Sequence, residues 1–133
     1  MDMRYTFGNT LTAAERLSRI ADFFDPYSAT FVHRYARGKL DLAADLGCGP
    51  GYTTHMLAKA SGALRTVGID RSEFFLQKAT LNFPEYEFVQ TDVSALPANP
   101  KYDLIYCRFL LSHLSSPEEV IASWLKCLNP DGM

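Results

Sequence analysis

A glycine-rich turn and an aspartate that follows it are the residues whose types and spacing could do chemistry. The turn, Asp45–Gly51, reads Asp-Leu-Gly-Cys-Gly-Pro-Gly and joins a short apolar run to a helical pattern. Glycines let a backbone bend sharply and approach a ligand closely, and the helix that follows presents unpaired amides and a positive dipole end. Asp70 closes the next apolar run about 20 residues later, where a carboxylate can bind both hydroxyls of a ribose. Together these residues predict a ligand that carries a ribose.

The same turn disfavours two common nucleotide sites. A dinucleotide-binding turn requires a third glycine at position 52, where this chain has Tyr52. A phosphate-binding P-loop requires Gly-Lys-Ser/Thr after the turn, and no such sequence follows Gly51. The ligand is therefore predicted to be neither NAD nor a nucleoside triphosphate.

The elements that must position this turn form an α/β pattern. From Asp41 onward, short apolar runs alternate with helical patterns, which is typical of βαβ units and a parallel sheet. The predicted strands are Leu42–Leu46, Arg65–Ile69, Tyr86–Gln90 and Asp103–Cys107, and the predicted helices between and after them are Tyr52–Lys59, Glu73–Asn82 and Pro117–Leu128.

Two further helices are predicted before the sheet. Thr12–Glu15 has the spacing of a capping box, and apolar residues follow it at helical intervals up to Phe24. The pair Asp25-Pro26 is expected to end this helix. Ser28 can begin a second helix, which Gly38 would close.

The ordered motifs resemble those of the class I S-adenosylmethionine-dependent methyltransferases, of the type that acts on small molecules. Asp45–Gly51 is similar to the first motif of that family, and Val67–Ser72 to the second. Phe88–Val93 is similar to the third motif, Tyr102–Arg108 to the fourth strand, and Leu128–Gly132 to a later turn. The resemblance implies a Rossmann-like, mainly parallel open sheet of strand order 3-2-1-4, with helices on both faces and N-terminal helices.

It also implies a division into residues 1–40, a helical segment that forms a lid or cap, and residues 41–133, a cofactor-binding core. The family's sheet usually has seven strands, so the last three are expected to be missing here. The fourth strand, Leu104–Cys107, would then be an apolar edge that favours a homodimer.

The implied cofactor is S-adenosylmethionine, with S-adenosylhomocysteine as its product. The residues expected to bind it are Asp45, Gly47, Cys48, Gly49, Gly51, Asp70, Arg71, Asp92, Val93, Cys107 and Arg108.

Several of these residues have a plainer interpretation. Asp92 could contact adenine or cap the turn that follows it, and Cys48 and Cys107 could simply fill the core where their strands end. Arg108 could line the cofactor pocket or reach solvent. His113 could lie near the transferred methyl group as the catalytic residue or could be structural.

The N-terminal segment offers two candidates for a lid over the methionine end of the cofactor. These are Tyr5 and Arg16, although Arg16 also suits the solvent face of its helix.

Composition limits the partners. A net charge of −2 over 133 residues gives no basic field for nucleic acid, so a small-molecule acceptor is expected. No apolar run reaches the roughly 18 residues of a membrane span, no export signal is visible, and the cytoplasm is the default location. Three separated cysteines predict no metal site. A non-catalytic cofactor-binding domain and a fragment of a longer enzyme are the alternatives.

Overall fold

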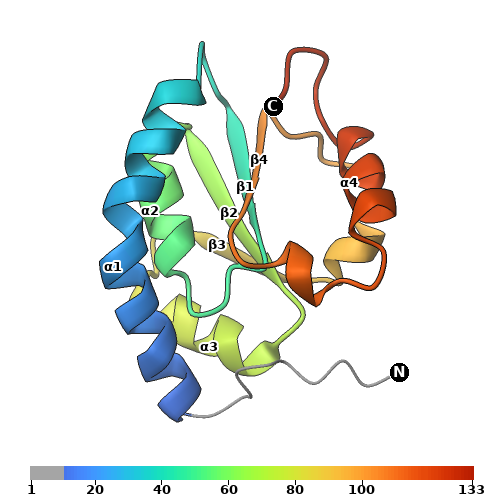
Figure 1. The fold of residues 1–133 in the computed structure, drawn as a ribbon. Coiled ribbons are helices and arrows are strands. Elements are labelled where there is room, and N and C mark those ends of the chain that lie inside the picture. Colours follow the sequence, from blue (N-terminus) through green and yellow to red (C-terminus); the bar gives the residue numbers. More distant parts are fainter. Residues whose placement is uncertain (1–10) are drawn as a thin grey trace.

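The computed structural model describes residues 11–133, and its centre is a four-stranded sheet (Figure 1). The strands are β1 (Leu42–Leu46), β2 (Arg65–Asp70), β3 (Glu87–Gln90) and β4 (Leu104–Cys107). They are mutually parallel in the order β3-β2-β1-β4. The predicted α/β class and strand order are therefore confirmed.

Strand β1 is buried because it pairs on both sides and is covered on both faces. Ala43, Ala44 and Leu46 have no exposed surface, which fits the rule that strands of a covered parallel sheet are apolar throughout. Leu46 is level with Ile69 of β2 and with Cys107 of β4. The carboxyl ends of three strands therefore lie at the same end of the sheet, and the residues that follow these strands are brought together there.

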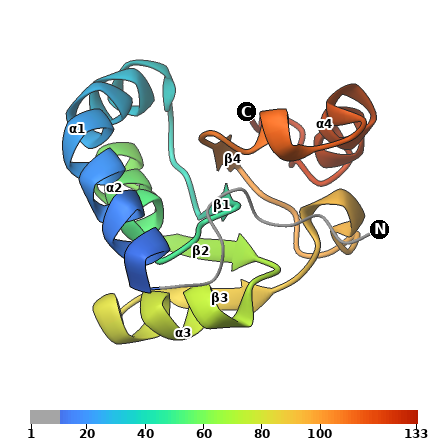
Figure 2. The same cartoon turned by 60° about the horizontal axis from the view of Figure 1, so that its bottom comes forward.

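Within residues 11–133, four helices surround the sheet. These are α1 (Leu11–Tyr35), α2 (Tyr52–Ser61), α3 (Glu73–Asn82) and α4 (Pro117–Leu125), with short 3-10 turns η1 (Val93–Ala95) and η2 (Leu111–His113). Helices α1 and α2 lie side by side on one face of the sheet and α4 lies on the other (Figures 1 and 2). No helix within residues 11–133 is long and apolar enough to cross a bilayer.

Helix boundaries follow local sequence at most ends. Ser72 begins α3, its hydroxyl accepting a hydrogen bond from the Phe75 amide. Helix α4 ends at Leu125, three residues before the predicted end at Leu128. The amides of Cys127 and Leu128 donate to carbonyls three residues earlier, which is the 3-10 pattern and not the α-helical one.

The prediction of two N-terminal helices is wrong, because α1 runs without interruption through Pro26. Proline inside a helix removes one backbone bond and costs about 3 kcal/mol. The helix continues because its packed face continues on both sides of the proline, with Ala21 and Val32 buried. Thr30 also donates its hydroxyl to the Pro26 carbonyl at 3.0 Å.

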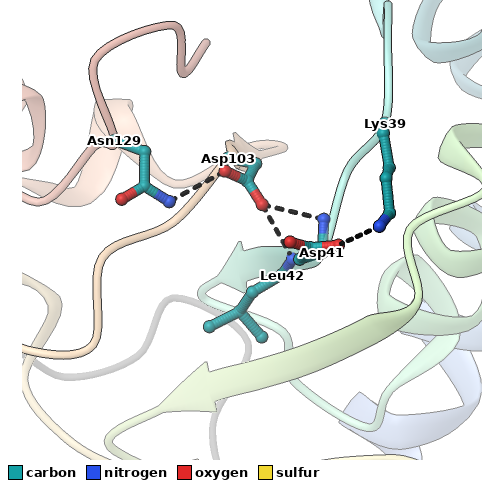
Figure 3. A network of polar contacts seen from close by, with 5 residues as sticks. All are labelled: Lys39, Asp41, Leu42, Asp103 and Asn129. Atoms are coloured by element: carbon teal, nitrogen blue, oxygen red, sulfur yellow. Dashed lines mark hydrogen bonds and ion pairs between the residues drawn. The ribbon is translucent and has the colours of Figure 1, made fainter.

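Asp103 ties the start of β1 to Asn129, in the turn that follows α4, at the amino-terminal end of β1 (Figure 3). Its Oδ2 accepts the amides of Asp41 and Leu42 at 2.8 and 3.0 Å. Its Oδ1 accepts the side-chain amide of Asn129 at 2.8 Å. These hydrogen bonds lower the pKa of the Asp103 carboxyl group, and the bond from the Leu42 amide has the largest effect.

Met133 pairs with the outer side of β4. Its amide donates to the Asp103 carbonyl at 3.0 Å, and the Ile105 amide donates to the Met133 carbonyl at 2.7 Å. This is the hydrogen-bond pattern of a parallel bridge.

We predict that Asp103→Asn lowers the free energy of unfolding by about 1 kcal/mol at neutral pH, since it weakens charge-assisted bonds at a partly exposed site. A carboxyl group whose pKa is lowered by folding stabilises the protein above its usual pKa, and this contribution is lost as pH falls through the folded value. Urea denaturation at a series of pH values should show the difference from wild type shrinking below the usual pKa of 3.8. An equal loss at every pH would contradict the assignment.

Candidate functional site

The glycine turn leaves β1 and is held by the end of β2. The amides of Gly47 and Cys48 both donate to the Ile69 carbonyl, at 2.8 and 3.1 Å. Asp70, only 1% exposed, accepts the amide of Gly49 through Oδ2 and that of Ser72 through Oδ1, each at 2.9 Å. One carboxylate thus fixes both the glycine turn and the start of α3.

Gly51 shows why the turn requires glycine. Its φ is +92°, and a Cβ there would lie 3.0 to 3.1 Å from the side chains of Phe83, Ala79 and Phe88. A larger residue would have to displace α3 and β3 together, so close packing and backbone conformation both select glycine.

Asp45, the acidic residue of β1, has a buried carboxyl group in which only one oxygen accepts hydrogen bonds from described residues. Its Oδ2 accepts the hydroxyls of Thr53 and Thr54 at 2.5 and 2.9 Å. Its Oδ1 has no hydrogen-bond partner among the described residues. Burial raises the pKa to about 7, against the opposing effects of the two threonines and of the Arg108 charge. A buried acceptor of this kind favours a ligand that brings a donor.

A cavity of about 90 Å³ opens beside this turn. Three segments form its walls: helix α1, the glycine turn with the start of α2, and the loop after β4. The lining residues are Leu17, Ile20, Ala21, Gly47, Cys48, Gly49, Pro50, Tyr52, Thr53, Arg108, Phe109, Leu110 and His113.

The structure brings part of the predicted set to this cavity. The predicted residues that line it are Gly47, Cys48, Gly49, Arg108 and the predicted catalytic residue His113. Asp45 and Asp70 lie buried at the adjoining strand ends, and Gly51 begins α2. Cys107 is the last residue of β4.

Three other predicted cofactor-binding residues, Asp92, Val93 and Arg71, are absent from the described lining of the cavity. Asp92 begins η1, where its carboxylate accepts the Ser94 amide at 2.8 Å, which is the capping role that the sequence left open. Val93 is buried, and its carbonyl accepts the indole N–H of Trp124 at 2.7 Å. Arg71 is exposed directly after β2.

Only one of the two lid candidates, Arg16, lies among the described residues. Arg16 is exposed on α1, and the neighbouring residue Leu17 lines the cavity instead. Tyr5 lies outside the described residues.

The cysteines near the site favour the protonated thiol over the nucleophilic thiolate. Burial raises the pKa of Cys48 well above its usual value and that of Cys107 to about 11. Both are free, as is Cys127. Thiolates are the reactive form, so these residues fill space where β1 and β4 end.

Sequence reasoning missed the wall that α1 contributes. Leu17, Ile20 and Ala21 were visible as an apolar stripe at helical spacing, and such a stripe normally indicates a core face. Thr53 was missed for a different reason: its role depends on reaching back to Asp45 across the turn. Only the fold reveals that contact.

Comparison with known proteins places the chain in a family. Residues 43–132 match the model of the methyltransferase domain family, and the chain belongs to that family. The match and the shared fold confirm the predicted class, the S-adenosylmethionine-dependent methyltransferases, whose cofactor is S-adenosylmethionine.

Individual relatives support the same class. Over 91 residues the chain is 38% identical to the trans-aconitate 2-methyltransferase of Paracidovorax citrulli (strain AAC00-1), which covers 67% of this chain and 35% of that protein. The enzyme of that name from Escherichia coli O157:H7 is 34% identical over 94 residues, covering 71% of this chain and 37% of its own. The chain therefore spans about a third of the length of the curated relatives it matches.

Two solved structures share the fold. One is a protein from Methanococcus maripaludis that is named as an S-adenosyl-L-methionine-dependent methyltransferase, with a TM-score of 0.80 and 21% identity over 97% of this chain and 63% of that one. The other is the plantazolicin methyltransferase BpumL in complex with SAH, with a TM-score of 0.70 and 22% identity over 86% of this chain and 49% of that one.

We predict that Asp45→Asn stabilises the protein without added ligand. A carboxyl group whose pKa is raised to about 7 by folding makes the folded state progressively less stable as pH rises from its usual pKa to that value. The amide carries no charge, so the variant should gain on the order of 2 kcal/mol near neutral pH, and the gain should fade in acid. Thermal unfolding across this pH range measures it. A variant less stable than wild type at neutral pH would contradict the buried-acid assignment.

Proposed function

We propose that this chain binds S-adenosylmethionine in the cavity beside the glycine turn and contributes to transfer of its methyl group to a small-molecule acceptor. The observation that carries the proposal is the Asp70 carboxylate bound to the Gly49 and Ser72 amides. This contact shapes the glycine turn at the carboxyl ends of the strands, where open α/β sheets bind nucleotides and other ligands. Residues 41–133 form the proposed binding core, and residues 1–40 its cap.

The residues present fit the cofactor. The unpartnered Asp45 Oδ1 is an acceptor that the ammonium group of the methionine part would satisfy. Gly47 and Gly49 line the cavity with no side chain to obstruct it. Asp70 is proposed to hold the ribose, since each carboxylate oxygen can accept two hydrogen bonds. The remaining proposed contacts are those of Cys48, Gly51, Arg71, Asp92, Val93, Cys107 and Arg108.

The chemistry itself asks little of the protein. The bound cofactor supplies a methyl group on a sulfonium, which leaves as a neutral thioether when an acceptor attacks in line. The chain's residues hold the two partners in that alignment, a contribution that can reach about 7–11 kcal/mol of a reaction barrier. Leu17, Ile20 and Ala21 give the cavity one apolar wall.

His113 is the proposed catalytic residue for acceptors that carry a proton. It lies in η2 and lines the cavity, which supports a role in accepting a proton from a hydroxyl or amine. A carboxylate acceptor would need no base. The relatives named trans-aconitate 2-methyltransferases favour a small organic acceptor for this chain as well.

A small molecule rather than nucleic acid is the proposed acceptor, which the net charge of −2 supports. A cytoplasmic location is proposed because Cys48, Cys107 and Cys127 are all free thiols.

We predict that Gly49→Ala weakens S-adenosylhomocysteine binding at least about tenfold, because a methyl group enters the cavity while the fold is kept. At a φ of +52°, with nothing nearer than 3.8 Å to the added Cβ, the backbone cost is about 1–2 kcal/mol. Gly62→Ala is the matched control. It has a φ of +68° and open space and lies at the end of α2, so it should lose similar stability and keep full binding.

Isothermal titration calorimetry with S-adenosylhomocysteine measures both variants. Micromolar binding by wild type and by Gly62→Ala, and weak binding by Gly49→Ala, supports the site. Equal binding by all three proteins would place the cofactor elsewhere, and no binding by folded wild type would reject the proposal.

We also propose a homodimer through the outer edge of β4. Met133 pairs with the first part of this edge, so a second copy would add its strand from Ile105 onward. Exposed strand edges favour such pairing. Light scattering at tens of micromolar is expected to give twice the monomer mass of 14.9 kDa, and a monomer throughout would contradict the proposal.

A further inference from the structure

Arg108 directly follows β4, yet its guanidinium binds two side chains of α1. Its Nη1 donates to Asp25 Oδ1 at 2.8 Å and to Ser28 Oγ at 3.1 Å. The Arg108 side chain is 11% exposed and that of Asp25 is 30% exposed. Ion pairs that are this shielded from solvent are screened less than surface pairs and leave a poorly solvated charge when broken.

The helix that Arg108 holds is one wall of the cofactor cavity. Leu17, Ile20 and Ala21 of α1 face the glycine turn across it. The packing is close: a Cβ on Gly49 would lie 3.8 Å from Leu17 Cδ1. The position of α1 therefore sets the width of the cavity.

Asp25 does not itself line the cofactor cavity. It lies one turn beyond Ala21 and borders the outer groove between α1 and α2, and it is absent from the described lining of the cofactor cavity. An effect of Asp25 on ligand affinity would therefore act through the position of α1 or through Arg108, which lines the cavity itself, and hydrogen exchange in α1 separates the two routes.

The loop on the other side of the ion pair is strained. Phe109 has a φ of +57°, a conformation that costs free energy for any residue with a Cβ. Its ring packs edge-on against Phe24 of α1, with centroids 5.0 Å apart. Both Arg108 and Phe109 thus attach this loop to the same stretch of α1.

We propose that Asp25 and Ser28 are positioning residues: through Arg108 they fix α1 as the third wall of the cofactor cavity. An ion pair whose carboxylate lies outside the cavity then determines how tightly the cofactor is held. This inference rests on the proposed function for the identity of the ligand. The claim that the ion pair fixes α1 can be tested without ligand.

The test uses Asp25→Asn, which keeps the shape of the side chain and removes its charge. Calorimetry with S-adenosylhomocysteine should show binding weakened roughly tenfold, the usual scale for residues that couple to a site without touching it. Hydrogen exchange without ligand should become faster in α1 and stay unchanged in β1 and β2.

Three further variants make the result specific. Asp22→Asn is the matched control, since Asp22 is exposed on the same helix and borders the same outer groove; it should bind as wild type does. Asp25→Glu restores the charge and should recover most of the affinity. Ser28→Ala keeps the ion pair and removes only one hydrogen bond from the Arg108 guanidinium. It should therefore weaken binding less than Asp25→Asn does, by about two- to threefold, and it serves as the test if Asp25→Asn does not fold.

Unchanged exchange in α1 of Asp25→Asn would overturn the inference even if the affinity falls, since the loss would then act through Arg108 directly. Equal affinity of wild type and Asp25→Asn would also overturn it, as would an equal loss in Asp22→Asn. If folded wild type binds no S-adenosylhomocysteine, the proposed function fails instead. Faster exchange confined to α1 in Asp25→Asn would then still support the structural role of the pair, and unchanged exchange would reject it.

Discussion

The contact on which this structure depends is the hold of one buried carboxylate, Asp70, on two backbone turns. Gly49 belongs to the turn after β1 and Ser72 to the turn after β2, and each donates its amide to a different oxygen of Asp70. A buried charge requires such donors to offset its desolvation. The parallel register of β1 and β2 places the donors within reach. The same contact joins the turns after β1 and β2 at the carboxyl ends of the strands and shapes the site.

The site is assembled at a cost to stability. Asp45 is buried with one unpartnered oxygen, and burial raises its pKa to about 7. Phe109 holds a backbone conformation that residues with a Cβ avoid. Strain and unsatisfied polar groups are typical of functional sites, where the surrounding structure imposes them. Here the surroundings are the α1 helix and the strand β4, which Arg108 ties together.

Local sequence patterns predicted the sheet and most helices because those elements follow local rules. The bounds of β1 and α3 match the prediction, since an apolar run and a Ser72 cap define them without reference to the rest of the chain. The continuity of α1 through Pro26 was not predictable, because distant packing decides it. The ion pair of Arg108 and Asp25 spans 83 residues, and the cavity wall from α1 depends on it. Asp103 likewise read as part of a strand, and only the fold shows it joining β1 to the turn at Asn129.

The central claim is that the cofactor binds against the glycine turn, between α1 and the loop after β4. The most direct measurement is a titration of isotope-labelled protein with S-adenosylhomocysteine, followed by amide nuclear magnetic resonance. The account predicts large shifts for the amides of Gly47, Cys48 and Gly49, and small ones in α4 on the opposite face of the sheet. A well-dispersed spectrum in which these glycine-turn amides do not move at saturating ligand would contradict it.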